Sequence, residues 1–297
     1  MNKFRMNYRS RQTLITWLFR SPILALQLLV IFLPAVSAIY YSLTKWSGIG
    51  LQAEYIGLEN FRRILGDRIY WLAFSHNIIY LVIFVTIPFV ISLFAASILA
   101  PVKRGGMFFR TALFIPYILP SVITSFIWKG IFNPDIGLGS VFAKIGIPIF
   151  TKSYLGMPST ALYVIAFIDN WHFWGFLMIL FLTAMQAVPP ELYDAAKIDG
   201  ANKWNQFRHV TLPGIRPTVM FMLMMLGVWC FQVFDWVQIL TGGGPGNSSQ
   251  VLSTYLYQVA ILTFNAGYGS AIGITISMFA LLIIAVFTVI RRRGWEI

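Results

Sequence analysis

The chain has 297 residues, of which 58% are hydrophobic and 11% are charged, and its mean hydropathy is +0.74. A soluble globular protein carries roughly 25% charged residues, so this composition excludes a water-soluble domain. The formal net charge is +12, but the positions of the basic residues indicate membrane orientation rather than a nucleic-acid surface.

Six apolar segments of about the length that crosses a bilayer follow one another along the chain. We expect each to be a helix, because lipid cannot satisfy the hydrogen bonds of open backbone. Their approximate spans are 21–43, 74–100, 107–128, 159–186, 217–240 and 268–290. The sequence therefore predicts an all-α polytopic membrane protein, with a six-helix domain at 21–290 and short tails at 1–20 and 291–297.

The first segment contains Val36-Ser-Ala38, which resembles a signal-peptide cleavage site. However, its apolar run continues to Leu43, beyond the roughly 7–15 residues of a signal-peptide core. We therefore interpret this segment as a retained signal anchor.

Lys and Arg are distributed unevenly between the two sides of the predicted bundle. Fifteen of the 22 basic residues lie in the N-terminal tail, the loops after segments two and four, and the C-terminal tail. Cytoplasmic loops carry an excess of Lys and Arg, so both termini are predicted to be cytoplasmic.

Segments three and four contain proline and polar residues that ordinary membrane spans lack. Pro116 and Pro120 predict a kink in segment three.

A carboxylate at the bilayer centre costs about 2.5–3.5 kcal/mol on insertion scales, so Asp169 needs a partner or a wet cavity. His172 lies three residues further on and shares its helix face. Segment four also carries Asn170 and Trp174, and segment five carries Trp229, Gln232, Asp235 and Gln238 at a spacing of three.

The loop at 189–213 has more ordered features than a simple connection needs. Pro189-Pro190 ends segment four and permits a new helix, because proline is tolerated in a first helical turn. The acidic Glu191 and Asp194 favour the positive end of that helix. Leu192, Ala195, Ala196 and Asp199 recur at helical spacing and share one face. Gly200 is the predicted stop, Asn202 the predicted cap of a second helix, and Trp204, Phe207 and Val210 share a face of that helix.

The loop at 241–267 contains no Asp, Glu, Lys, Arg or His, and it opens with Gly242-Gly-Gly-Pro-Gly246. No Gly-Lys dipeptide occurs in the chain, so it lacks a phosphate-binding loop and we expect no ATP to bind here. Residues 251–262 are predicted to form a short helix.

The 189–213 loop resembles a known family motif. Asp194-Ala195-Ala196, Gly200, Val210 and Leu212-Pro213 keep every spacing of the "EAA" loop found in permease subunits of binding-protein-dependent ATP-binding-cassette importers, with Asp for Glu and Val for Ile. Phe114-Ile-Pro-Tyr-Ile-Leu-Pro120 and Leu240-Thr-Gly-Gly-Gly-Pro245 are similar to regions of sugar-importer permeases. The resemblance runs from about residue 20 to 290 and favours the maltose-permease-F and glycerol-phosphate-permease-A types.

The resemblance implies a type I importer permease in a bacterial cytoplasmic (inner) membrane. Such a chain pairs with a second homologous permease, contacts two ATPase subunits that bind ATP and Mg, and receives a sugar from an extracytoplasmic solute-binding protein. It binds no cofactor or nucleic acid and catalyses no reaction itself. The residues expected to contact the ATPase are Glu191, Leu192, Asp194, Ala195, Ala196, Asp199, Gly200, Leu212 and Pro213. The residues expected along the solute pathway are Asp169, Asn170, His172, Trp174, Trp229, Gln232 and Asp235.

Other interpretations remain open at this level. Asp169 and His172 could pair with each other structurally, or the polar residues could bond to the partner permease. A self-sufficient secondary transporter or channel could use Asp169, His172 and Asp235 as a proton relay, but that function leaves the 189–213 loop without a purpose. A membrane enzyme with Asp169 and His172 as acid and base is disfavoured, because the three histidines lie in separate regions.

Overall fold

The computed structural model describes residues 8–50, 52–102, 104–146 and 151–292. Within these ranges five helices are long and apolar enough to cross a membrane: Thr16–Ser42, Arg68–Leu99, Ala161–Gln186, Arg216–Leu240 and Ala266–Ile290. A sixth span exists if the bent pair Gly106–Ile118 and Ser121–Ile131 is counted as one. The predicted six-segment, all-helical organisation is therefore confirmed, with a correction to its third member.

The chain forms two compact units. One comprises the described part of Met1–Leu65 together with Val259–Ile274, and the other comprises Gly66–Gln258 with the described part of Thr275–Ile297.

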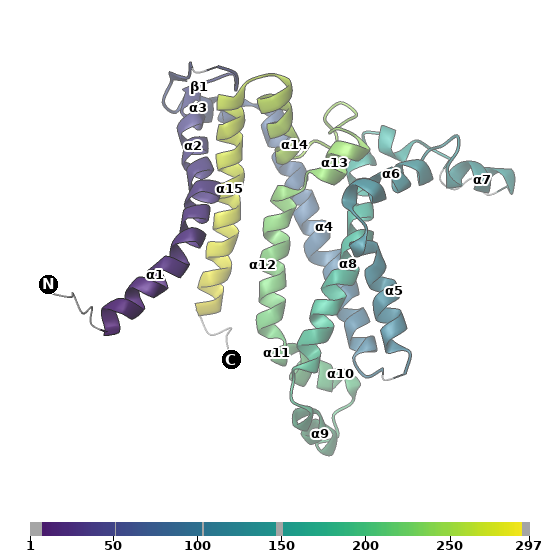
Figure 1. Ribbon diagram of the computed structural model, residues 1–297. Helices are drawn as coiled ribbons and strands as arrows, with labels where there is room; N and C mark the ends of the chain where they lie inside the picture. Colours follow the sequence, from purple (N-terminus) through teal and green to yellow (C-terminus); the bar gives the residue numbers. More distant parts are fainter. Residues whose placement is uncertain (1–7, 51, 103, 147–150, 293–297) are drawn as a thin grey trace. The chain divides into compact units, whose positions relative to one another are not determined.

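The first unit contains the N-terminal span and the ordered loop that follows it. Its elements are α1 (Tyr8–Gln27), η1 (Leu28–Phe32), α2 (Leu33–Ser42), β1 (Thr44–Lys45), β2 (Glu54–Tyr55), α3 (Glu59–Gly66), most of η4 (Gln258–Leu262) and the first turns of α15 (Ala266–Ile290). The helical run begins at Tyr8, well before the predicted boundary at 21 (Figure 1). Asn60 is buried and its Nδ2 donates to the carbonyls of Ser42 and Thr44, each at 2.9 Å. These bonds fix α3 against the end of α2.

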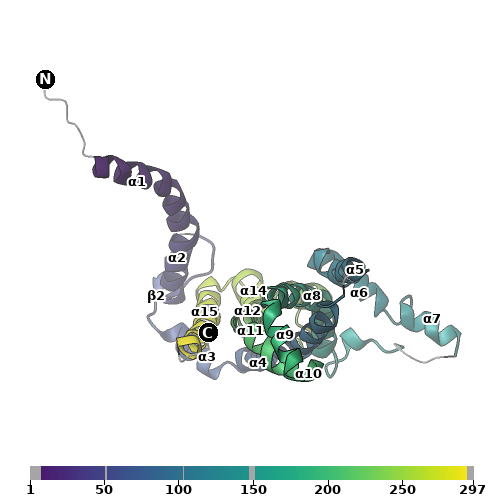
Figure 2. The same ribbon diagram turned by 90° about the horizontal axis from the view of Figure 1, so that it is seen from below.

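The second unit is a helical bundle around α8 (Ala161–Gln186). It also contains α4 (Arg68–Leu99), α5 (Gly106–Ile118), α6 (Ser121–Ile131), α7 (Leu138–Lys144), η2 (Tyr154–Gly156), α9 (Pro190–Ile198), α10 (Lys203–Gln206), η3 (Phe207–Thr211), α11 (Leu212–Gly214), α12 (Arg216–Gln232), α13 (Asp235–Leu240) and α14 (Leu252–Tyr257). The view from below in Figure 2 shows α4 and α12 beside α8, and both helices pack against it. In the most apolar window of α8, 61% of the residues are buried, so its neighbours rather than lipid cover this span.

Polar side chains connect the helices of this bundle where apolar packing alone would leave backbone groups unsatisfied. Asn77 on α4 donates from Nδ2 to the Cys230 carbonyl at 2.6 Å, and its Oδ1 accepts from the Leu252 backbone N–H at 2.9 Å. Asn77 is completely buried and so joins α4 to α12 and to the start of α14. The predicted helix at 251–262 is confirmed as α14 followed by η4.

Two predicted spans are broken, and both breaks matter for the site. Segment three bends by 92° between Ile118 and Ser121, so the proline kink is confirmed but the straight helix at 107–128 is wrong. Segment five is interrupted at Val233 and Phe234. Val233 leaves the helical conformation. Its carbonyl accepts a hydrogen bond from the Ser253 hydroxyl instead of from the next helical turn. The break is stable because a residue from another helix satisfies the exposed acceptor.

Candidate functional site

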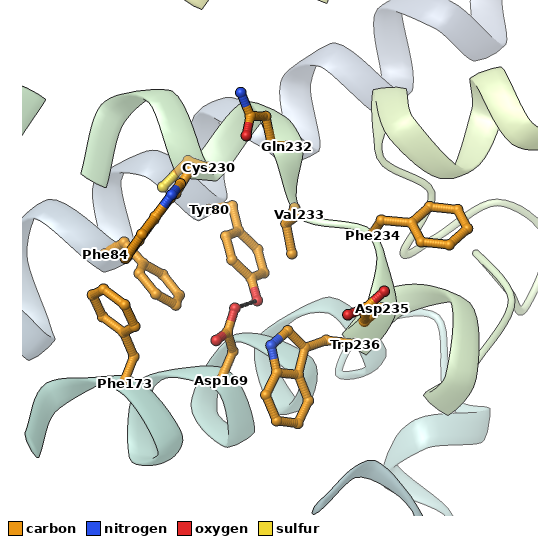
Figure 3. Close-up of a pocket in the computed structure, with 11 residues that line it drawn as sticks. Tyr80, Phe84, Asp169, Phe173, Cys230, Gln232, Val233, Phe234, Asp235 and Trp236 are labelled. Atoms are coloured by element: carbon orange, nitrogen blue, oxygen red, sulfur yellow. Dashed lines mark hydrogen bonds between the residues drawn. The ribbon is translucent and has the colours of Figure 1, made fainter. Parts of the chain in front are cut away.

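A cavity of about 270 Å³ lies where α4 and α8 meet the break between α12 and α13. This volume is slightly below the roughly 300–1,000 Å³ typical of small-molecule sites. Figure 3 shows its lining side chains. They are Tyr80, Phe84, Asp169, Phe173, Trp229, Cys230, Gln232, Val233, Phe234, Asp235 and Trp236.

Asp169 contributes a buried carboxylate to the wall of this cavity. Its side chain is 8% exposed, and its Oδ2 accepts a hydrogen bond of 2.7 Å from the Tyr80 hydroxyl. The dashed line in Figure 3 marks this bond between α8 and α4. A buried carboxylate needs such a donor to offset the loss of water, so Tyr80 is the partner that the sequence left unidentified.

His172 does not pair with Asp169. Its Nε2 lies 2.9 Å from the Leu119 carbonyl, at the bend between α5 and α6 where helical bonding of that carbonyl is lost. The suggested structural pair Asp169–His172 is therefore wrong. His172 instead connects α8 to the bend.

Asp235, the first residue of α13, also lines the cavity. Its side chain is exposed, and its Oδ2 accepts a hydrogen bond of 2.9 Å from the Ser121 hydroxyl on the first residue of α6. Lys129, near the other end of α6, donates from Nζ to the Ile239 carbonyl at 3.4 Å. The two short helices that follow the two breaks are thus connected at both ends.

The structure brings together four of the seven predicted pathway residues: Asp169, Trp229, Gln232 and Asp235 all line the cavity. Asn170 and Trp174 do not line it: Asn170 donates to the Ala166 carbonyl, and the Trp174 carbonyl accepts from Ser92. Of the four residues that recur at a spacing of three in segment five, Trp229, Gln232 and Asp235 line the cavity, although the break at 233–234 separates Gln232 from Asp235.

Tyr80, Phe173 and Trp236 are lining residues that the sequence interpretation missed. A signal for Tyr80 was present: His76, Asn77 and Tyr80 place three polar side chains on one face of an otherwise apolar span. Phe173 and Trp236 carried no such signal, since aromatic residues are common throughout the chain.

The 189–213 loop forms a second candidate site, separated along the chain from the cavity. Helix α9 begins at Pro190 and ends at Ile198, and Gly200 takes the left-handed conformation with φ +76°. The Asn202 side chain caps α10 by accepting from the Asn205 backbone N–H at 2.9 Å. The predicted stop and cap are both confirmed.

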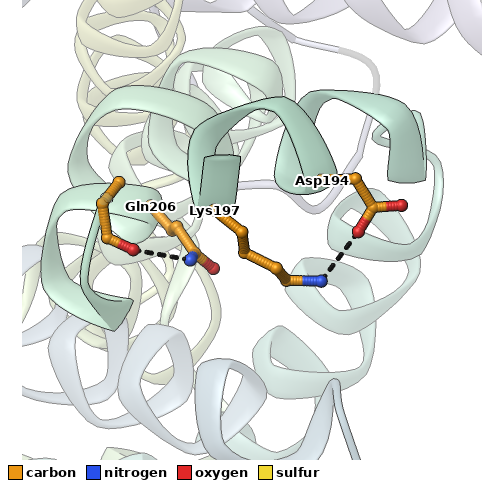
Figure 4. Close-up of polar contacts among 4 residues, drawn as sticks. Asp194, Lys197 and Gln206 are labelled. Carbon is orange, nitrogen blue, oxygen red and sulfur yellow. Dashed lines mark hydrogen bonds and ion pairs between the residues drawn. The ribbon is translucent and has the colours of Figure 1, made fainter. Parts of the chain in front are cut away.

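Helix α9 presents its surface to the outside. None of its residues is buried, and the exposed fractions of Leu192 and Ile198 are 50% and 87%. Tyr193 turns toward the bundle and bonds to the Thr211 hydroxyl at 2.9 Å. Figure 4 shows the exposed ion pair between Asp194 and Lys197, at 2.8 Å, and Gln206 donating to the Ala201 carbonyl, at 2.9 Å.

The nine residues assigned to ATPase contact divide by exposure. Those exposed are Glu191, Leu192, Asp194, Ala195, Asp199 and Gly200. Ala196, Leu212 and Pro213 are half-buried.

Comparisons with known proteins agree with this architecture. Residues 88–294 match the family model described as "Binding-protein-dependent transport system inner membrane component". The chain is 33% identical over 275 residues to the probable ABC transporter permease protein YurN of Bacillus subtilis, covering 92% of this chain and 94% of that protein. It is 32% identical over 282 residues to the diacetylchitobiose uptake system permease protein NgcF of Streptomyces coelicolor, covering 91% of this chain and 80% of that protein.

Among solved structures, a chain of a bacterial alginate ABC transporter, in complex with an alginate-pentasaccharide-bound periplasmic protein, superimposes with a TM-score of 0.86 at 20% identity. The match covers 98% of this chain and 99% of the other. It establishes a shared fold.

Proposed function

Because the chain belongs to the family of binding-protein-dependent transport system inner membrane components, we propose that it is a membrane-spanning subunit of an ATP-driven carbohydrate importer. Several relatives are named as permeases for diacetylchitobiose, trehalose and maltose, or lactose. The observation in this chain that carries the proposal is the uncovered helix α9, which exposes apolar side chains between two spans.

Helix α9 is the proposed contact with an ATPase subunit. Leu192, Ala195 and Ile198 follow one another at helical spacing and are all exposed, which is typical of a surface that a partner covers. Tyr193 and the cap at Asn202 connect this helix to the bundle. Movement of the ATPase would therefore pass through α9 to η3 and the start of α12.

The cavity is the proposed part of the solute pathway. Carboxylate and amide groups of Asp169, Asp235 and Gln232 suit sugar hydroxyls, and the rings of Trp229 and Phe173 suit the apolar faces of a sugar. The cavity lies at the break between α12 and α13, and broken spans are where transporters place their solute sites. A second, homologous permease would complete the pathway, and an extracytoplasmic binding protein would deliver the sugar.

The proposed setting is a bacterial inner membrane with both termini in the cytoplasm, as the distribution of Lys and Arg predicts. That orientation places α9 on the side where ATP is available. ATP and Mg would be held by the partner ATPase subunits, because this chain has no Gly-Lys phosphate-binding loop.

Co-purification tests the proposal directly. The chain is expressed with its neighbouring genes, purified and assayed for ATPase activity in lipid nanodiscs, with and without sugar-loaded binding protein. We expect ATPase subunits to co-purify and sugar-loaded binding protein to stimulate hydrolysis. A chain that purifies alone and moves solute on a proton gradient would instead be a secondary transporter.

A matched pair of variants tests the role of α9. Leu192→Ser combined with Ile198→Ser should sharply reduce the yield of co-purifying ATPase, because both apolar contacts are lost. Ile136→Ser removes an apolar side chain that is 79% exposed outside this loop and should leave the yield unchanged. Equal yields from both would remove α9 from the proposed interface.

A further inference from the structure

We infer that the cavity at the α12–α13 break accepts uncharged saccharides and excludes acidic ones, such as uronates and sugar phosphates. This inference rests on the proposed function and narrows its solute class. Two carboxylates, from Asp169 and Asp235, line the cavity, and none of the described lining residues is Lys, Arg or His.

The basic side chains nearest to the cavity along the chain are engaged elsewhere. His172 is directed by its Nε2 toward the Leu119 carbonyl at 2.9 Å. Lys129 donates to the Ile239 carbonyl, one helical turn beyond Asp235, and does not line the cavity. An acidic solute would therefore find no counter-charge among the described lining residues.

The hydrogen-bond donors of the two carboxyl groups bring no positive charge to the cavity. Tyr80 donates a hydroxyl to Asp169, and Ser121 donates a hydroxyl to Asp235. Both donors are neutral, so they orient the carboxylates without an opposite charge. The remaining lone pairs can accept hydrogen bonds from solute hydroxyls, which is the pairing an uncharged sugar provides.

Coulomb repulsion gives the expected size of the discrimination. At an effective dielectric constant of about 20, one carboxylate roughly 10 Å from an anionic group disfavours it about tenfold.

The shared fold does not determine this property. A solved transporter of similar fold is involved in the import of the acidic polysaccharide alginate, at 20% identity to this chain. The charge of the cavity depends on individual side chains at the break, such as Asp235, and these can differ while the helices superimpose.

Thiol modification measures the charge of the cavity without knowledge of the solute. Gln232→Cys is introduced into a Cys230→Ser background, and the complex is purified in nanodiscs. Reaction rates are measured with three methanethiosulfonate reagents of similar size, one cationic, one neutral and one anionic. Each rate is divided by the rate of the same reagent with a free thiol in solution. We expect the anionic reagent to react at least about tenfold more slowly than the cationic one.

Two comparisons make the result specific. Leu262→Cys, at an exposed site in the uncharged 241–267 loop, should show nearly equal rates for the three reagents. Adding Asp235→Asn to Gln232→Cys preserves an acceptor for Ser121. This change should reduce the ratio of the cationic rate to the anionic rate by at least about tenfold. Asp169→Asn provides an independent second variant with the same expected direction.

Equal anionic and cationic rates at Gln232→Cys, or no response to either Asp→Asn change, would overturn the inference. The measurement requires neither ATP hydrolysis nor transport. The importer function can therefore be supported by co-purification while the charge selectivity fails, or the reverse. As a direct check, proteoliposomes holding the full complex should take up methyl glucoside in preference to methyl glucuronide; preferential uptake of the glucuronide would also overturn the inference.

Discussion

Gly175 on α8 provides a sharp test of how the bundle is assembled. A Cβ atom at this position would collide with the Leu113 carbonyl oxygen of α5, and would lie 2.9 Å from the Leu113 carbonyl carbon and 3.3 Å from the Phe114 Cα. All three are backbone atoms, so no side chain can rotate to make room. Relief requires α5 and α8 to separate by roughly 1 Å, since ordinary carbon contacts begin near 3.4 Å.

Gly175→Ala should therefore destabilise the bundle by the cost of overpacking, about 1–3 kcal/mol. For a protein of this size, each kcal/mol lowers the Tm by about 2–4 °C, so we expect a decrease of roughly 2–12 °C. Small residues at interhelical contacts are what allow close approach of membrane helices. Transport should also fall, because displacement of α5 moves the Leu119 carbonyl away from His172.

The assay is thermal unfolding of the purified complex in detergent, followed by the loss of the monodisperse peak in size-exclusion chromatography. Gly130→Ala is the matched control, because a Cβ there meets nothing within 4 Å and alanine favours a helix over glycine by about 1 kcal/mol. If Gly175→Ala melts at or above the temperature of the wild type, the close α5–α8 contact is not as described and the reasoning fails.

Three further perturbations follow from the structure. Gly200→Val places a β-branched residue at φ +76°, a strain of about 1–3 kcal/mol; the yield of co-purifying ATPase should fall, and a wild-type yield would count against the proposed coupling. Asp235→Ala and Gln232→Ala should each slow transport without preventing assembly, and unchanged transport kinetics would remove both from the pathway. Asn60→Ala orphans two buried carbonyls at about 1–3 kcal/mol each; hydrogen exchange across 54–66 should accelerate, and unchanged protection would refute the anchoring role.

The elements that the sequence predicted well are those governed by local chemistry. Gly200 ends α9 because a left-handed residue stops a helix, and Asn202 caps α10 because its side chain accepts a backbone N–H. Both effects act within a few residues, so the sequence pattern is sufficient. The sequence also predicted the kink near Pro116 and Pro120 from local chemistry. It did not predict the 92° angle of that kink.

The partners of polar side chains inside the spans could not be predicted in this way. Asp169 and His172 share a helix face by spacing, yet Asp169 binds Tyr80, 89 residues away, and His172 contacts the carbonyl of Leu119. In an apolar span, hydropathy reports only that lipid or protein surrounds the helix. It does not report which neighbour supplies a donor.

By itself, then, the sequence determined the membrane class, the number of apolar segments and the helical loop at 189–213, since each depends on composition or on spacing within a few residues. Only the tertiary structure decided that segment five breaks at Val233, where the Ser253 hydroxyl from α14 satisfies the free carbonyl, and that Asp169 and Asp235 line one cavity. The physical reason is that a broken helix and a carboxylate within a span are stable only when distant parts of the chain supply the missing hydrogen bonds.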